Sequence, residues 1–166
     1  MGPAITIGSS PVRRGSGAGA RVEPRRIFVD TGAWFAVQVG DDEWHGNAVG
    51  TLQALLAGSY ALVTTNHVVG ETYTLLRVVC GHRAAVRFLD HLEETRRLER
   101  IFVRDEIEAR AVRLLRQHAE QAFSFVDATS FAVMRAERIR HAFAFDRHFA
   151  TAGFLRVPMD VPVRQI

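Results

Sequence analysis

The stretch that decides the fold is Ile27-Phe-Val-Asp-Thr-Gly-Ala-Trp34, in which a short apolar run ends in an aspartate and a helical pattern follows. Two later stretches repeat this arrangement, Phe123-Ser-Phe-Val-Asp127 and Phe143-Ala-Phe-Asp146. Short continuous apolar runs are typical of strands that are buried on both faces of a sheet. We therefore predict strands over residues 27–30, 61–64, 101–103, 123–127, 142–146 and 154–157.

Apolar residues between these runs recur with a period of about 3.6 residues, which indicates helices. The helical stripes cover residues 44–56, 68–79, 85–92, 107–118 and 128–139, and Gly153 is expected to end a short last helix over residues 147–152. Asp105 and Glu108 have the spacing of a capping box at the start of the fourth stripe. This alternation predicts an α/β fold, namely a three-layer α/β/α sandwich around a mostly parallel sheet of four or five strands.

Length and composition suit one domain with a short tail. The chain has 166 residues, of which 48% are hydrophobic, enough for one core. Residues 1–24 are rich in glycine and arginine and are predicted to be a disordered tail, so residues 25–166 form the domain. Cys80 is the only cysteine, which excludes an internal disulfide and a cysteine zinc cluster and favours the cytoplasm. No run approaches the roughly 18 apolar residues of a membrane helix.

All 21 basic residues are arginines. Residues 1–25 contain four of them and one glutamate, so the rest of the chain carries 17 arginines (21 − 4) against 17 acids (18 − 1). The body is therefore neutral overall, and any contact it makes with a nucleic acid must depend on where individual arginines lie.

Three aspartates stand at the ends of predicted strands: Asp30, Asp127 and Asp146. Each alone could be a helix cap, which stabilises by about 1 kcal/mol. Three together at the carboxyl edge of one parallel sheet would instead converge on one cleft. Clustered carboxylates repel one another unless a cation neutralises them. The pattern therefore favours a metal site over three separate caps.

Glu71 is a fourth acid, on the apolar side of a predicted helix and close to the start of that helix. Burying a glutamate there is costly without a partner, although a glutamate at the edge of the stripe could also reach solvent. Four carboxylates without cysteine suit a hard cation, Mg²⁺ or Mn²⁺. Such a site can activate water and offset charge on a phosphate, so a metal-dependent hydrolase is expected.

These pieces together resemble the PIN-domain ribonucleases, in particular the VapC toxins of VapBC toxin–antitoxin pairs. The matching stretches are Phe28-Val-Asp-Thr-Gly-Ala-Trp-Phe35, Thr64-Thr-Asn-His-Val-Val-Gly-Glu-Thr72, Phe125-Val-Asp-Ala-Thr-Ser-Phe131 and Phe143-Ala-Phe-Asp-Arg-His-Phe149. The resemblance spans residues 27 to 157. It implies a Mg²⁺- or Mn²⁺-dependent ribonuclease that forms homodimers and is inhibited by a small antitoxin.

By motif position, the resemblance implies that Asp30, Glu71, Asp127 and Asp146 are both the catalytic residues and the metal ligands. It also marks polar residues beside them, whose implied roles are to orient carboxylates or to bind water. Each of these could equally be a helix cap. Arg147 directly follows Asp146 and could contact a phosphate. The polar residues beside the acids are Thr31, Asn66 and Thr129.

Other readings of the residues remain open. A PIN-like module could bind RNA or protein without cutting, although all four acids are present. A dehalogenase-like phosphatase needs a second aspartate where this chain has Gly32, and a receiver domain needs a lysine. An RNase H-like nuclease would begin with an antiparallel meander, which the pattern does not show. His67 and His148 lie beside the motifs and could meet substrate, while the sequence does not identify the RNA.

Overall fold

The computed structural model describes residues 25–58, 60–95 and 97–166, and within them five strands form one sheet. Every neighbouring pair of strands is parallel, and the order is β3-β2-β1-β4-β5. The strand bounds are β1 Arg26–Val29, β2 Ala61–Thr65, β3 Leu98–Ile101, β4 His141–Phe143 and β5 Leu155–Val157. The predicted, mostly parallel sheet of four or five strands is therefore confirmed. The predicted tail, residues 1–24, lies outside the described residues.

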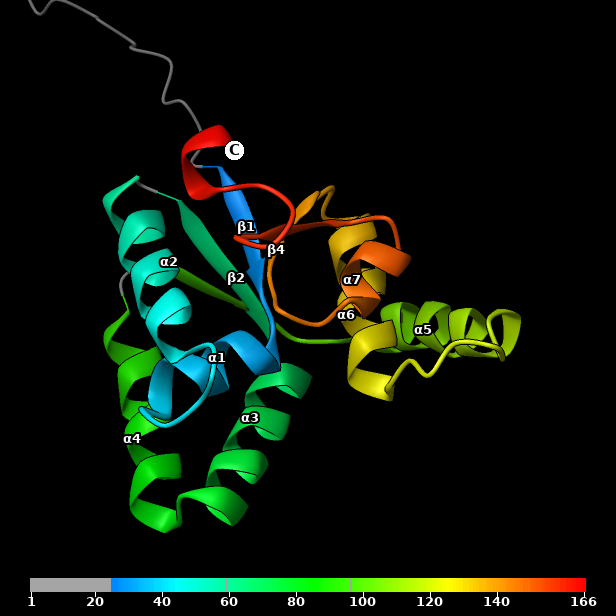
Figure 1. The fold of residues 1–166 in the computed structure, drawn as a ribbon. Coiled ribbons are helices and arrows are strands. Elements are labelled where there is room, and N and C mark those ends of the chain that lie inside the picture. Colours follow the sequence, from blue (N-terminus) through cyan, green and yellow to red (C-terminus); the bar gives the residue numbers. More distant parts are fainter. Residues whose placement is uncertain (1–24, 59, 96) are drawn as a thin grey trace, which may run out of the picture.

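Helices cover both faces of this sheet. Figure 1 shows α1 to α4 on one side and α5 to α7 on the other, as expected for right-handed crossovers that reverse direction at β1. The expected three-layer sandwich is therefore present. Among the described residues, none of the helices is long and apolar enough to cross a membrane. The helices are α1 Thr31–Gln38, α2 His45–Ala57, α3 Asn66–Val79, α4 His82–Glu94, α5 Asp105–Gln117, α6 Phe125–Ala136, α7 His148–Thr151 and the 3-10 turn η1 Val163–Gln165.

The core lies around the central strand β1. Phe28 is fully buried, and its ring packs on Phe149 of α7 with the ring centroids 6.2 Å apart. Phe149 in turn meets Phe131 of α6 at 5.0 Å. Each fully buried phenylalanine contributes roughly 1.5–3 kcal/mol. These packed aromatic rings fix α6 and α7 against the sheet. They thereby fix Asp127 in α6 and Asp146, which lies just before α7.

One predicted strand is wrong. Residues 123–127 do not join the sheet, because Ser124 caps α6 and Asp127 already lies in the first turn of that helix. The apolar character of this segment has another cause. Phe123 packs edge-on against Phe131, with centroids 5.3 Å apart, and so seals the start of α6 rather than a strand.

Two smaller expectations also fail. The third strand spans Leu98–Ile101 instead of residues 101–103, because it is an edge strand in register with β2 and its middle residues, Glu99 and Arg100, are exposed. The capping box expected from Asp105 and Glu108 does not form. The N-cap of α5 is Arg104, without a side-chain hydrogen bond, and the acids of the first turn instead favour the helix through its dipole.

Gly153 lies just after α7, whose end was expected there, and it has a positive φ of 91°.

Candidate active site

Asp30 directly follows the central strand and is the N-cap of α1. Its Oδ2 accepts a hydrogen bond from the backbone N of Gly32 at 3.2 Å, and the residue is only 7% exposed. Burial and the negative charge of Asp127 raise the pKa of Asp30 to about 7. The negative form of this carboxylate is therefore disfavoured by its protein surroundings, and a bound cation would stabilise it.

Asp127 reaches the same region from a helix rather than from a strand end. It is the third residue of α6, where its Oδ2 accepts the backbone N of Ser124 at 2.8 Å while the Ser124 hydroxyl accepts the backbone N of Asp127 at 2.9 Å. This reciprocal capping box holds the carboxylate in place. Within the described residues, Oδ1 of Asp127 has no hydrogen-bond partner, so it remains available to a ligand.

Glu71 lies on α3, and its Oε2 accepts a hydrogen bond of 2.6 Å from the hydroxyl of Thr31. The charge of Glu71 also contributes to the raised pKa of Asp30. Thr31 is buried in the first turn of α1, directly after Asp30. The hydrogen bond therefore joins the end of β1 to α3 and brings a third acid toward Asp30.

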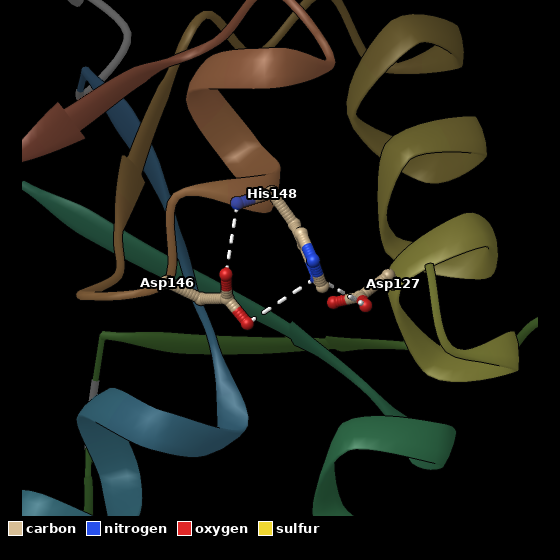
Figure 2. Close-up of side chains that lie close together, drawn as sticks. All are labelled: Asp127, Asp146 and His148. Atoms are coloured by element: carbon tan, nitrogen blue, oxygen red, sulfur yellow. Dashed lines mark hydrogen bonds and ion pairs between the residues drawn. The ribbon is translucent and has the colours of Figure 1, made fainter. Parts of the chain in front are cut away.

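Asp146 follows β4, and it is the most exposed of these acids, with 44% of its side chain accessible. Its Oδ1 accepts the backbone N of His148 at 2.8 Å. Figure 2 shows the His148 ring between the two carboxylates of Asp127 and Asp146. Its Nδ1 lies 3.2 Å from Oδ2 of Asp127 and 3.4 Å from Oδ2 of Asp146.

The other polar residues singled out from the sequence divide into two groups. Thr31 contacts an acid of the cluster, as described above. Asn66 instead accepts the backbone N of Val103 at 2.8 Å, which ties α3 to the loop before α5. Thr129 is fully buried and donates to the carbonyl of Val126 at 3.0 Å. Arg147 is exposed beside Asp146 and forms no ion pair with any described residue.

The comparisons with known proteins decide the family. The model of the PIN domain matches residues 27–155. The chain belongs to the PIN-domain family. This stretch begins at the fold-deciding strand and includes all four acids, so the predicted family and the observed fold agree.

Two named relatives narrow the resemblance within the PIN-domain family. The 23S rRNA-specific endonuclease VapC20 of Mycobacterium tuberculosis is 46% identical over 133 residues, which cover 79% of this chain and 97% of the relative. The VapC ribonuclease of Archaeoglobus fulgidus is 29% identical over 125 residues, covering 74% and 78%. Both names agree with the predicted ribonuclease class.

A solved structure supports the same assignment. The crystal structure of Mycobacterium tuberculosis VapC20, described as a sarcin-ricin loop cleaving toxin, matches with a TM-score of 0.71 at 43% identity. The match covers 79% of this chain and 98% of the crystallised one. The similarity therefore extends over nearly the whole relative, and not over the domain core alone.

The donor set of this PIN domain fits a hard divalent cation. Carboxylate oxygens are the ligands that Mg²⁺ and Mn²⁺ prefer. Burial first, and then the negative charges of Asp127 and Glu71, raise the pKa of Asp30, so a cation bound there would favour its charged form. One ligand atom each from Asp127, Asp146 and His148 lies within 4.8 Å of the other two. The carboxylates of Asp127 and Asp146 can therefore bind a metal ion, with His148, Asp30 and Glu71 beside them.

His148 is the member of this cluster that sequence reasoning did not include among the site residues. The sequence places it two positions after Asp146, beside the motif. Its contact with Asp127 depends on how α6 packs against the segment after β4, across 21 positions of the chain. A helical pattern cannot supply that information.

An apolar groove of about 650 Å³ adjoins Glu71 between α3 and the start of α6. Phe125 is 42% exposed there, and Val78 at the far end of α3 is 78% exposed. Apolar side chains grouped on one surface are typical of a protein interface. The lining residues are Asn66, His67, Gly70, Glu71, Thr74, Leu75, Val78, Phe125 and Val126.

Proposed function

We propose that this chain is an endoribonuclease that depends on Mg²⁺ or Mn²⁺ and hydrolyses RNA phosphodiester bonds at Asp30, Glu71, Asp127 and Asp146. The observation that carries the proposal is the gathering of carboxylate oxygens of Asp127 and Asp146 within 4.8 Å of one another beside the buried Asp30. Burial and the neighbouring acids also raise the pKa of Asp30 to about 7. A protein keeps such an unfavourable charge cluster where a cation neutralises it in use.

The chain's own residues have distinct tasks in this proposal. Asp30 and Asp127 would hold the ion, since backbone N–H groups anchor one carboxylate at the end of β1 and the other in the first turn of α6. A bound divalent ion supplies Lewis-acid chemistry, lowering the pKa of water and offsetting charge on the phosphate. Glu71, oriented by Thr31, completes the acidic shell together with Asp146.

Exposed residues at the edge of the site would position the substrate. Arg147 directly follows Asp146 and is exposed, so its guanidinium can pair with a phosphate of the bound strand. Asn66 and Thr129 act less directly. Asn66 fixes the loop before α5, and Thr129 fixes the start of α6, the helix that carries Asp127.

In the cell, we propose that the protein is the toxin of a type II toxin–antitoxin pair in the cytoplasm. The relative named as specific for 23S rRNA suggests ribosomal RNA as the substrate. The groove between α3 and α6 supports a homodimer, because its exposed apolar residues lie beside the acidic cluster and need a protein partner. The antitoxin is expected to inhibit the enzyme by binding this dimer.

Cleavage of 23S rRNA by the purified protein tests the function. We expect cutting with Mn²⁺ that Asp30→Asn abolishes, because the amide cannot supply the negative charge that binds the ion. Asp90→Asn is the matched control, since Asp90 is an exposed aspartate on α4. If wild type binds this RNA but never cuts it, the non-cleaving PIN-like module is the better account.

A further inference from the structure

His148 contacts two acids that come from different elements, and it does so through two different groups. Its backbone N donates to Asp146 Oδ1 at 2.8 Å, and its ring Nδ1 lies 3.2 Å from Asp127 Oδ2. Since carboxylates only accept, Nδ1 must carry the proton in this arrangement. One residue thus links the segment after β4 to the first turn of α6 (Figure 2).

The ring of His148 is held in a fixed orientation. It packs edge-on against Phe123, with ring centroids 5.4 Å apart, and its side chain is only 20% exposed. Asp127 Oδ2 already accepts the backbone N of Ser124. With the second donor, from His148, Oδ2 accepts two hydrogen bonds, while Oδ1 of Asp127 has no partner among the described residues.

We propose that His148 is a positioning residue of the metal site. Its Nδ1–H binds Asp127 and its backbone N–H binds Asp146, which holds the two carboxylates side by side against their mutual repulsion, so that both can bind one divalent ion. This inference rests on the proposed metal-dependent function. It assigns His148 a hydrogen-bonding task, and the nitrogen itself is not a ligand.

Two substitutions separate the donor from the ring. His148→Phe keeps the aromatic packing against Phe123 and removes the donor. His148→Asn removes the ring and places an amide N–H close to the position of Nδ1. The donor model predicts opposite outcomes for the two variants, whereas a purely structural role predicts that the loss of the packed ring is the more harmful change.

Calorimetric titration of Mn²⁺ into the full-length protein, without RNA, is the first test. We expect His148→Phe to lower the affinity by about 10- to 100-fold, the usual cost of losing a partner that orients a ligand, and His148→Asn to stay close to wild type. Steady-state cleavage should show the loss in kcat, with KM for RNA unchanged in both variants. Wild-type Mn²⁺ affinity in His148→Phe would overturn the positioning role.

Two further outcomes are decisive. A preference for Mn²⁺ over Mg²⁺ that disappears in both variants would overturn the proposal by making Nδ1 a ligand, since imidazole nitrogen suits the softer ion. If wild type itself binds no Mn²⁺, the metal-dependent function fails, and the positioning role fails with it. Asp30→Asn, tested in parallel, separates loss of the whole site from loss of the orienting hydrogen bond.

A second surface carries an independent inference. A groove of about 240 Å³ lies between α5 and α6, and every charged residue that lines it is basic. Arg110 and Arg113 stand one helical turn apart on α5 and are exposed, and neither forms an ion pair with a described residue. The lining residues are Arg110, Arg113, Leu114, Gln117, His118, Ala132 and Arg135.

This groove leads toward the acidic site. His118, which lines the groove, meets Phe123 with centroids 6.4 Å apart, and Phe123 also meets His148 at 5.4 Å. Arg135 is oriented by its position over Phe154 and by a hydrogen bond to the carbonyl of Ala152. Exposed guanidinium groups without an ion-pair partner are suited to bind phosphate oxygens. We infer that the groove binds the phosphate backbone of the substrate RNA beyond the cleaved bond.

Binding of a labelled single-stranded oligouridine in EDTA tests the groove without cleavage. The double variant Arg110→Gln, Arg113→Gln should bind more weakly and should flatten the plot of log affinity against log salt by about 1.4, or 0.7 for each lost phosphate contact. Arg83→Gln, Arg87→Gln on α4 is the matched control, since both residues are exposed on the opposite layer. Equal effects of the two pairs would overturn the inference. If the wild-type protein does not bind the oligouridine at all, the inference is also overturned. The metal titration above would in that case still test the proposed cleavage site.

Discussion

Thr31 and Glu71, which stand 40 positions apart in the chain, share a hydrogen bond of 2.6 Å between Oγ1 and Oε2. Thr31 opens α1 directly after Asp30, and Glu71 lies one turn into α3. The bond therefore joins α1 to α3, two helices on the same face of the sheet. It explains how a glutamate on the apolar side of a helix is kept within reach of the cluster.

Thr31→Val should weaken metal binding while the fold is retained. Valine has nearly the same shape but cannot donate to Glu71, so the glutamate is free to turn away. We expect about a 10- to 100-fold loss of Mn²⁺ affinity and a matching loss of cleavage at limiting metal. Thr74→Val is the control, because the Thr74 hydroxyl bonds only to a carbonyl of its own helix. Equal affinities in the two variants would contradict an orienting role for Thr31.

The metal-free protein should lose stability as the pH rises. Asp30 has a pKa of about 7 when folded, against about 3.9 in an unfolded chain. The folded state therefore binds the proton more tightly, and its advantage is full below pH 4 and is lost as the pH rises through 7. The loss amounts to up to about 4 kcal/mol.

Urea unfolding in EDTA at pH 5 and pH 8 measures this effect. Asp30→Asn should be much less sensitive to pH, because the amide does not titrate. Adding millimolar Mn²⁺ to wild type at pH 8 should restore stability, since the ion binds the folded cluster only. A wild-type stability that rises between pH 5 and pH 8 in EDTA would show that Asp30 is not the controlling group.

Ser124→Ala should affect both stability and activity. It removes half of the capping box at the start of α6, which costs about 1 kcal/mol. It also frees Asp127 from its fixed place, so cleavage should fall further than the small stability loss explains. Asp127→Asn is the counterpart, because its amide oxygen can still accept the backbone N of Ser124. We expect this variant to melt close to wild type and to be inactive.

Val78→Glu should weaken self-association. Val78 is 78% exposed at the end of the α3 groove, and a charge there would oppose burial in a homodimer. Light scattering at micromolar concentration should report a dimer for wild type and a monomer for the variant. Met159→Glu is the control, as Met159 is an exposed apolar residue outside the groove. A wild-type monomer would contradict the proposed homodimer.

The sequence predicted the sheet and the place of Asp30 for a simple reason. Asp30 follows β1 directly, so a local pattern of apolar residues and one aspartate is sufficient. Asp146 was predicted to end a strand over residues 142–146, but β4 ends at Phe143 and Asp146 lies in the segment after it. For Asp127 the residue was predicted but not its element. The aromatic run before it resembles a strand, yet it serves to pack Phe123 on Phe131 while Ser124 caps α6.

The contacts within the site depend on tertiary packing and could not be predicted. Asn66 lies beside the acids in the sequence, but its side chain turns to the backbone of Val103. His148 lies two positions after Asp146 in the sequence, but its contact with Asp127 depends on where α6 packs. Motif spacing gives the residue types of a site, and the packing of helices decides which of them meet.

The ends of the RNA products test the central claim most directly. Hydrolysis by water activated at the acidic cluster leaves a 5′-phosphate and a 3′-hydroxyl, whereas attack by the RNA's own 2′-hydroxyl leaves a 2′,3′-cyclic phosphate. We predict 5′-phosphate products with Mg²⁺ or Mn²⁺, and no cleavage in excess EDTA or by Asp127→Asn. Cyclic phosphate ends, or full activity in excess EDTA, would contradict the account.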